Sequence, residues 1–210
     1  MPDDALIMKE VYSPADIALL CKKDVAEVRS WMEQGLLRCF QVTGGHLRVT
    51  HESLSDFMEA GKIEKPGEWN AAPQKLRVLV VEDDPDLLEI ISELLKEEPR
   101  IEVRAENNGF TAGLQIAGWY PDLVLLDFLM PGISGFELCA RLRENEKTSD
   151  LPVLAMTSLT SIDKKREIYE SGVSDFLGKP FRSQDLLHKV RLLLGLDPAY
   201  RTASTGAKKA

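Results

Sequence analysis

The chain has 210 residues, of which 44% are hydrophobic and 29% are charged. This composition is typical of folded globular proteins and excludes a disordered or membrane-embedded chain. The length exceeds the roughly 100–150 residues of a single domain and favours two. The net charge of −8 argues against a chain covered with the lysine and arginine that bind nucleic-acid phosphates.

Cysteine usage and the pattern of apolar runs indicate the cellular compartment. Cys21, Cys39 and Cys139 are odd in number, widely separated and without metal-ligand spacing, so we expect reduced, part-buried packing residues. No apolar run approaches the roughly 18 residues that span a bilayer. Residues 1–10 lack the basic and then apolar organisation of a signal peptide. We therefore expect a cytoplasmic protein.

The amino-terminal part predicts a helix-turn-helix followed by a hairpin. Ser13, a proline and an acid form a helix start, and Gly35 ends an apolar stripe of helical period. A Thr-Gly-Gly-His turn lies between two apolar runs. The predicted elements are helices over Ser13–Leu20 and Asp24–Gln34, strands over Leu36–Val42 and Leu47–Thr50, and a helix over His51–Ala60.

The domain boundary is predicted within residues 61–74, GKIEKPGEWNAAPQ, because this segment is rich in Gly, Pro and polar residues and has no apolar period, as is typical of a linker. Trp69 within it either docks between two domains or rests on one of them. The small, polar end of the chain predicts a disordered tail. The expected organisation is a first domain over 1–63, a linker over 64–74, a second domain over 75–197 and the tail over 198–210.

The second domain alternates β-branched runs with amphipathic stretches. The predicted strands are Arg77–Val81, Ile101–Ala105, Leu123–Asp127, Val153–Thr157 and Asp175–Leu177. Five helices follow them, the first starting at an Asp84 N-cap with Pro85 in its first turn. Runs such as LVLLD are apolar on both faces, which indicates a parallel sheet covered by helices on each side. The fold class is therefore α/β, a five-stranded doubly wound parallel sheet.

Polar residues collect where these strands end, which is where ligands bind in such sheets. Glu82 and Asp83 end the first strand, Asp127 the third and Thr157 the fourth, and Lys179 follows the fifth. Three carboxylates brought together repel one another unless a cation lies among them, and magnesium prefers a few carboxylates with water and a phosphate oxygen. The set suits phosphoryl transfer, with Asp127 as nucleophile, Lys179 as a fixed positive charge and Thr157 as a hydroxyl donor.

The segments VVEDDP, LLDFLMPGISGFEL, MTS and DFLGKPF, which carry these residues, resemble the flavodoxin-like receiver domain of two-component response regulators. The resemblance implies that Asp127 takes a phosphoryl group from a sensor histidine kinase or a histidine phosphotransfer protein. It also implies that Asp83 binds Mg²⁺ directly, Glu82 largely through water and Leu129 through its carbonyl. Thr157 and Phe176 would form the switch that reports phosphorylation, and the alternative role for Phe176 is that of an ordinary core aromatic.

The segments YSPADIALL, VRSWMEQGLL and TGGHLRVT resemble the small winged helix-turn-helix of excisionases and MerR-type regulators. The resemblance implies DNA contacts by Arg29, Arg38, His46 and Arg48. Acids lie on or beside the expected reading helix, at positions 24, 27 and 33, and weaken the attraction for phosphate. An interaction module that binds protein and no DNA is therefore the alternative. A dedicated enzyme is disfavoured because no second catalytic constellation appears, and a receiver-mediated homodimer is a further expectation.

Overall fold

The computed structural model describes residues 8–61, 63, 69, 74–158, 161–197 and 200. The chain divides into two compact units. The first takes the described residues of 1–42, 46–74 and 195–210, and the second takes 43–45 and 75–194. Most of the predicted linker and tail, and Leu159, lie outside the described residues. Within the described ranges, no helix combines the length and the apolar character that crossing a membrane requires.

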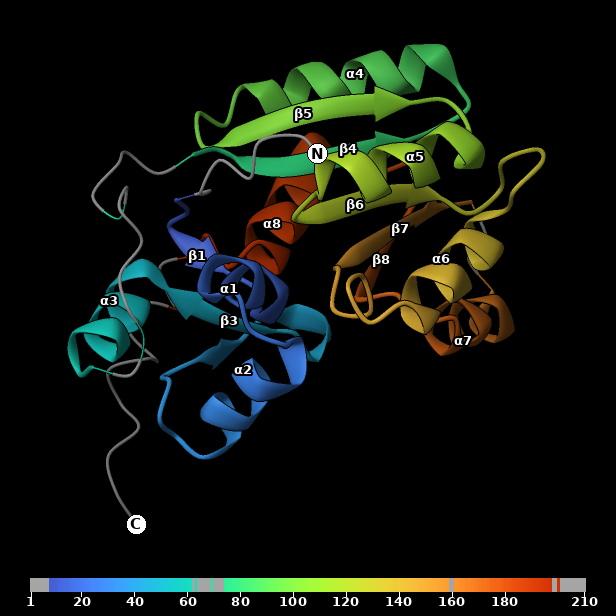
Figure 1. Ribbon diagram of the computed structural model, residues 1–210. Coiled ribbons are helices and arrows are strands. Elements are labelled where there is room, and N and C mark those ends of the chain that lie inside the picture. Colours follow the sequence, from blue (N-terminus) through green and yellow to red (C-terminus); the bar gives the residue numbers. More distant parts are fainter. Residues whose placement is uncertain are drawn as a thin grey trace. The chain divides into compact units, whose positions relative to one another are not determined.

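Among its described residues, the first unit contains the helices α1, α2 and α3 and a small antiparallel sheet with the strand order β1-β3-β2 (Figure 1). A reciprocal capping box starts its first helix, since Ser13 Oγ accepts from the Asp16 N–H and the Asp16 carboxylate accepts from the Ser13 N–H. The elements are β1 (Val11–Tyr12), α1 (Pro14–Cys21), α2 (Val25–Glu33), β2 (Phe40–Gln41), β3 (Leu47–Thr50) and α3 (His51–Glu59). The 3-10 turn η1 (Thr43–Gly45) follows β2 along the chain but is grouped with the second unit. Helices α1 and α2 and the antiparallel pair β2 and β3 lie where helices and a hairpin were predicted, whereas the winged helix-turn-helix fold itself stays a prediction.

Two details of this unit differ from the prediction. The strand predicted from Leu36 begins only at Phe40, because Gly35 has a φ of 68° and turns the chain back on α2. The N–H groups of Leu36 and Leu37 then both donate to the Trp31 carbonyl and are unavailable to a sheet. Strand β1 was not predicted, because two residues are too few to show a period.

Trp69 rests on the first unit, which is one of the two alternatives that its sequence position leaves open. Its side chain is buried in that unit's hydrophobic core. The indole stacks on the His51 ring with 4.6 Å between centroids, and its Nε1–H donates to Ser55 Oγ at 3.2 Å. The His51 ring in turn lies against Tyr12, whose hydroxyl is 3.0 Å from His51 Nδ1.

The second unit is a five-stranded parallel sheet with the strand order β5-β4-β6-β7-β8, as predicted. Reversal of the strand order between β4 and β6 makes it doubly wound. Asp84 caps the first helix by accepting from the Asp86 and Leu87 N–H groups. The elements are β4 (Leu76–Val81), α4 (Pro85–Lys96), β5 (Ile101–Glu106), α5 (Gly109–Trp119), β6 (Leu123–Asp127), α6 (Gly135–Glu144), β7 (Val153–Thr157), α7 (Ile162–Glu170), β8 (Asp175–Gly178) and α8 (Ser183–Leu193).

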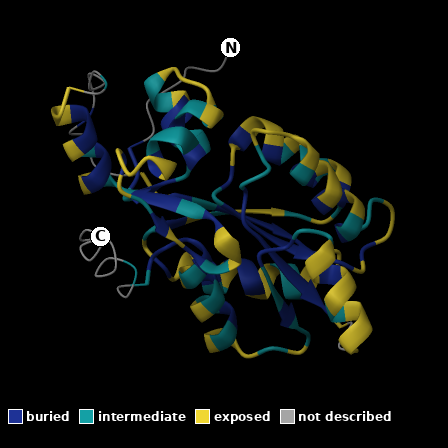
Figure 2. Cartoon of the chain, turned by 90° about the horizontal axis from the view of Figure 1, so that it is seen from below, coloured by how far each residue is buried: buried dark blue, intermediate teal, exposed yellow. Residues whose placement is uncertain are grey.

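Helices cover both faces of this sheet. Figure 1 shows α5 in front of the sheet and α8 behind it. One cluster of buried side chains joins α5, α6 and α7 to alternate residues of β4, β6 and β7, as expected when successive strand residues point to opposite faces. Every residue of β6 and β7 is buried, and Figure 2 shows the strands buried while the helices keep exposed outer sides. The carboxyl ends of the strands therefore stand at one edge of a rigid layer.

One half-buried cation, Arg143, links two connecting segments next to the sheet. The Arg143 guanidinium, at the end of α6, donates through Nε to the Gly172 carbonyl at 2.8 Å. Its Nη1 lies within hydrogen-bond distance of the carbonyls of Thr148, Ser149 and Leu151, at 3.3, 3.1 and 3.0 Å. Burial lowers the pKa of Arg143 from its ordinary value. The side chain thus ties the loop after α6 to the turn after α7.

Candidate functional site

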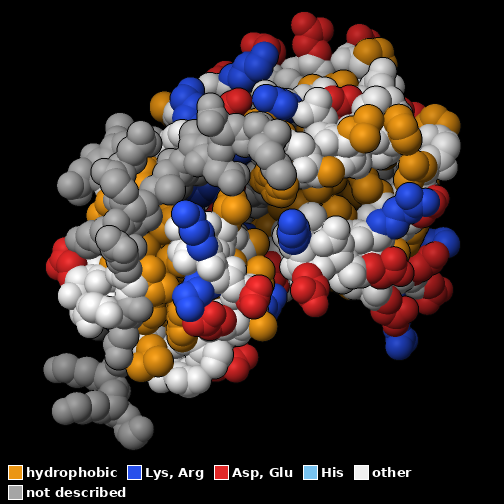
Figure 3. All heavy atoms as spheres, in the orientation of Figure 1, with side chains coloured by type: hydrophobic (Ala, Val, Ile, Leu, Met, Phe, Trp, Pro, Cys, Tyr) orange, Lys and Arg blue, Asp and Glu red, His pale blue; other side chains and the backbone are white. Residues whose placement is uncertain are grey.

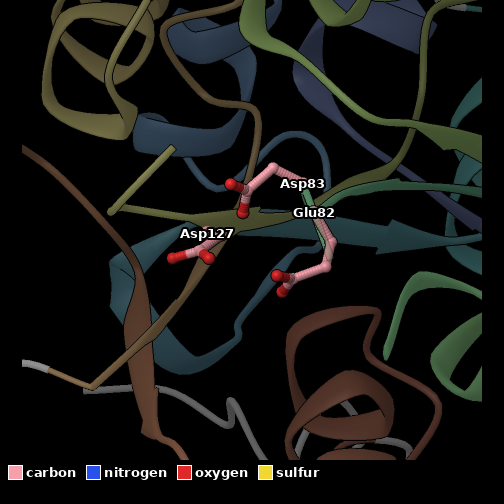
Figure 4. A group of neighbouring side chains, drawn as sticks. All are labelled: Glu82, Asp83 and Asp127. Carbon is pink, nitrogen blue, oxygen red and sulfur yellow. The ribbon is translucent and has the colours of Figure 1, made fainter. Parts of the chain in front are cut away.

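Three carboxylates meet at the carboxyl ends of β4 and β6. The two strands are parallel neighbours with Val81 opposite Leu126, so Glu82, Asp83 and Asp127 come to the same edge of the sheet. One oxygen from each carboxylate lies within 4.8 Å of the others, and Figure 4 shows the three side chains converging. Glu82 and Asp127 are buried whereas Asp83 is exposed. Of the three acids, Asp83 is the one that solvent reaches, so a ligand would approach the cluster from the side of Asp83.

Lys179 supplies the positive charge in this cluster. Its Nζ donates to Asp127 Oδ2 at 2.7 Å and to Glu82 Oε1 at 2.8 Å. The backbone N–H of Lys179 donates to the Thr157 carbonyl at 2.8 Å, so the segment after β8 is fixed against the end of β7. The predicted group of Glu82, Asp83, Asp127, Thr157 and Lys179 thus comes from adjoining strand ends.

The charge of the cluster is not balanced. Burial, and to a smaller extent the nearby Asp127 charge, raise the pKa of Glu82 to about 7, although the hydrogen bond from Lys179 opposes the rise. Burial of the Lys179 ammonium lowers its pKa, but the hydrogen bonds to Asp127 and Glu82 outweigh this and raise it overall. A protonated lysine therefore faces three acids, and one of these acids resists ionisation.

The donor set fits a hard divalent cation. Glu82 Oε2 is buried and has no hydrogen-bond partner, and although it lies 2.6 Å from Lys179 Nζ the geometry is not that of a hydrogen bond. A buried carboxylate oxygen without a donor is costly unless another positive group reaches it. Carboxylates with water and phosphate oxygens are the ligands that Mg²⁺ prefers. Glu82, Asp83 and Asp127 are the residues that could hold the ion.

The remaining predicted residues surround Asp127. The Leu129 N–H donates to Asp127 Oδ1 at 2.9 Å, and the Leu129 side chain is 48% exposed. Thr157 is fully buried at the end of β7. Phe176 lies in β8, half-buried against the core.

Two neighbours of Phe176 were not identified from the sequence. The Tyr169 ring meets the Phe176 ring edge-on with 5.6 Å between centroids, and Lys165 Nζ lies 5.1 Å from the centre of the same ring. Both residues belong to α7, and their spacing of four places them on one side of that helix. This spacing was the signal available in the sequence.

The four basic residues predicted to contact DNA do not share one environment. Arg38 is exposed and pairs with Asp56, and Arg29 is half-buried on α2. His46 and Arg48 are buried, and Arg48 Nη1 donates to the Leu47 carbonyl at 2.7 Å. The DNA-contacting set therefore stays a prediction, and the structure lends it little support.

The sheet topology and the acid-lysine cluster define the class: this is the receiver of a signalling protein. The family described as the response regulator receiver domain matches residues 78–191, which is 114 of the 210 residues, and the chain belongs to this family. The family consists of signalling and transcription regulators.

Similar proteins and structures agree with this assignment. The DNA-binding dual master transcriptional regulator RpaA of Synechocystis sp. is 37% identical over 118 residues, covering 56% of this chain and 48% of its own length. The transcriptional regulatory protein TcrA of Mycobacterium tuberculosis is 34% identical over 144 residues, covering 69% and 55%. The chain thus spans about half the length of the curated relatives it matches.

Solved structures match the second unit over nearly their whole length. The signal receiver domain of a DNA binding response regulator protein (merR) from Colwellia psychrerythraea 34H has a TM-score of 0.55 at 28% identity, covering 58% of this chain and 99% of its own. The chemotaxis response regulator CheY4 of Vibrio cholerae has a TM-score of 0.54 at 28% identity, covering 57% and 99%. The comparison confirms the parallel-sheet receiver fold.

Proposed function

We propose that this two-component response regulator accepts a phosphoryl group on Asp127, with Mg²⁺ held by Glu82, Asp83, Asp127 and the Leu129 carbonyl, and passes the signal to its amino-terminal unit. The observation that supports this most is the setting of the Asp127 carboxylate. One oxygen accepts from Lys179 Nζ and the other from the Leu129 N–H, so a buried nucleophile is held in a fixed orientation. Fixed orientation is the main contribution of a protein to phosphoryl transfer.

The chemistry follows from these positions. An Asp127 oxygen attacks the phosphorus of a phosphohistidine on a sensor kinase or phosphotransfer protein, forming an O–P bond while the N–P bond breaks and its electrons leave with the histidine nitrogen. Bound Mg²⁺ would offset negative charge on the phosphoryl oxygens. Lys179 Nζ already lies 2.7 Å from Asp127 Oδ2 and can turn to a phosphoryl oxygen, and the Thr157 hydroxyl donates to another.

Phosphorylation would then be read at Thr157 and Phe176. Movement of Thr157 toward the phosphoryl group leaves room beside β7, and inward rotation of Phe176 fills it. That rotation breaks the contacts of Phe176 with Tyr169 and Lys165, so the packing of β8 against α7 changes. A local charge thereby selects between two packing arrangements.

The acceptor site is tested with acetyl phosphate, Mg²⁺ and intact-protein mass spectrometry. Wild type should gain a phosphoryl group and Asp127→Asn should not, because its side chain is no longer a nucleophilic carboxylate. Asp83→Ala should lose labelling through loss of metal affinity. Asp86→Asn is the matched control, since Asp86 is an exposed acid on α4. Labelling of the Asp127 variant at the wild-type level would refute the assignment.

For the output, we propose transcriptional regulation through DNA binding by the first unit. The relatives RpaA, a DNA-binding transcriptional regulator, and TcrA, a transcriptional regulatory protein, support a transcriptional output. Anisotropy of duplexes from the protein's genomic neighbourhood should show binding that weakens with salt and is lost in an Arg29/Arg38/Arg48 triple alanine variant. Arg166→Ala, on the receiver, is the control.

The second candidate is a phosphorylation-controlled module that binds protein and no DNA. It is favoured by the ion pair that occupies Arg38 and by the burial of His46 and Arg48. No duplex binding in either phosphorylation state would establish this reading over the first.

A further inference from the structure

We propose that two copies of this chain associate through the outer side of α5 and the groove between α5 and α6. The occupant of the groove is the matching α5 of the second copy. The surface contains none of the residues of the acid-lysine cluster, and the association does not depend on phosphoryl transfer.

Two large apolar side chains project from this surface. Phe110 is 65% exposed and Leu114 is 61% exposed, and their spacing of four residues places them one turn apart on the same side of α5. Helix α5, with the sequence GFTAGLQIAGW, carries no charged residue. Figure 3 shows hydrophobic side chains gathered over α5. Depletion of charge around aromatic and aliphatic side chains is characteristic of the centre of a protein interface.

A groove of about 420 Å³ on the β8–α8 side of the receiver is partly charged, whereas the groove beside Phe110 and Leu114 is mainly apolar. This second groove has a volume of about 300 Å³, and Phe110 and Leu114 themselves form part of its wall, together with Gly113 and Ala117 of α5 and Ile133, Leu138 and Leu142. One surface therefore carries both projecting apolar groups and a recess for such groups. A surface that is complementary to itself is what a two-fold symmetric dimer requires.

Gly113 supports close approach by a second molecule. Glycine in a helix interior is unfavourable relative to alanine, so it is expected where something prevents a side chain. A Cβ atom at Gly113 would meet nothing within 4 Å, whereas one at Gly109 would lie 2.8 Å from the Ile133 carbonyl oxygen. Packing within the chain therefore accounts for Gly109 but not for Gly113. Gly118 of the same helix is equally open but does not line the groove, so Gly113 permits the close approach of a neighbouring backbone without requiring it.

The rim of the groove selects a second copy over an unrelated partner. Arg141 lines the groove, is 63% exposed and pairs with Glu137 at 2.7 Å. The rim thus carries one base and one acid. In the proposed dimer, with the two α6 helices antiparallel across a two-fold axis, Glu137 of each copy would face Arg141 of the other and give two attractive pairs.

The test is sedimentation equilibrium of the full, unphosphorylated chain over a hundredfold range of concentration. Wild type should form a dimer. Phe110→Glu and Leu114→Glu should each weaken association at least tenfold, whereas Ile90→Glu should not, because Ile90 is equally exposed but lies on α4. Asp127→Asn should dimerise as wild type does. The proposed phosphorylation site and the proposed dimer can therefore be refuted independently of each other. A monomer at every concentration, or equal disruption by Ile90→Glu, would overturn the proposal.

Two further variants separate an interface from a structural role. Gly113→Ala should raise the urea midpoint of the monomer and yet weaken the dimer, since the methyl group favours the helix but blocks approach. Glu137→Arg and Arg141→Glu should each remain monomeric alone and associate when mixed, because the mixture restores both pairs across the axis. If Gly113→Ala dimerises with wild-type affinity, the close approach at Gly113 is wrong. If the mixture of Glu137→Arg and Arg141→Glu associates no more than either variant alone, the two-fold pairing is wrong.

Discussion

Metal-free receiver protein should lose stability as pH rises, and Glu82→Gln should remove most of that loss. Glu82 is 1% exposed and its pKa is raised to about 7, chiefly by burial. Folding therefore disfavours the ionised form of this side chain. Its favourable contribution is fully present below the unfolded pKa and is lost as pH rises through the folded pKa, so the decline falls between about pH 4.5 and pH 7.

The size of the effect follows from the same values. Each tenfold change in proton affinity corresponds to about 1.4 kcal/mol, so a pKa that rises from 4.5 to about 7 costs about 3 kcal/mol in the unfolding free energy once Glu82 is ionised. Lys179 does not interfere in this range, because its raised pKa keeps it protonated. Glutamine keeps the shape of the side chain and cannot ionise.

The assay is urea unfolding at pH 5, 6, 7 and 8 in a chelating buffer, with Glu170→Gln as control because Glu170 is exposed on α7. Between pH 5 and pH 8, wild type and the control should lose about 3 kcal/mol more than Glu82→Gln. Mg²⁺ should then restore more stability to wild type at pH 8 than to the glutamine variant. Parallel pH profiles for wild type and Glu82→Gln would refute the reasoning.

Three further outcomes are expected. Leu129→Asn should shorten the life of the purified phosphoprotein in Mg²⁺, since an amide orients water beside Asp127 where leucine shields it; phosphate release at the wild-type rate would contradict this. Arg143→Ala should lower the unfolding free energy by about 3 kcal/mol, because its four carbonyl acceptors lose a charged donor. The control Arg166→Ala, at an exposed residue, should lower the unfolding free energy by less than about 1 kcal/mol. Equal urea midpoints for Arg143→Ala and Arg166→Ala would contradict this prediction. Trp69→Ala should destabilise the first unit by about 3–5 kcal/mol, measured as faster hydrogen exchange in α3 with α6 unchanged; unchanged exchange in α3 would show that Trp69 does not stabilise that unit.

The receiver fold and its site were predictable because both depend on short-range patterns. Fully apolar runs mark buried parallel strands, and parallel strands bring their carboxyl ends to one edge, so Asp127 and Lys179 meet although 52 residues separate them. The unequal burial of Glu82 and Asp83 was not predictable from the acids alone. It arises because adjacent residues at a strand end point to different sides, and only one side is covered.

Features that depend on few residues or on contacts between distant residues could not be predicted from the sequence. A two-residue strand such as β1 is too short to show an alternation of apolar and polar residues. Strand β1 is recognised in the structure by the pairing of Val11 with Thr50. The pattern around Leu36 is that of a strand, but its N–H bonds back to α2. Trp69 had two equal readings, because nothing local shows which surface an isolated aromatic residue in a polar segment will cover.

The bond from the Gln74 N–H to the Met8 carbonyl, at 2.5 Å, has a consequence for the covalent junction. Gln74 belongs to the first unit, the second unit resumes at Lys75, and β4 of the receiver begins at Leu76, so no free linker separates the units at this junction. Two chain steps of about 3.8 Å each keep these ends within about 8 Å in any orientation. Each unit therefore experiences the other at a high effective concentration. Weak attractions between them, too small to join separate proteins, would be populated here, and a phosphorylation-dependent change of about 1.4 kcal/mol would alter that population balance tenfold.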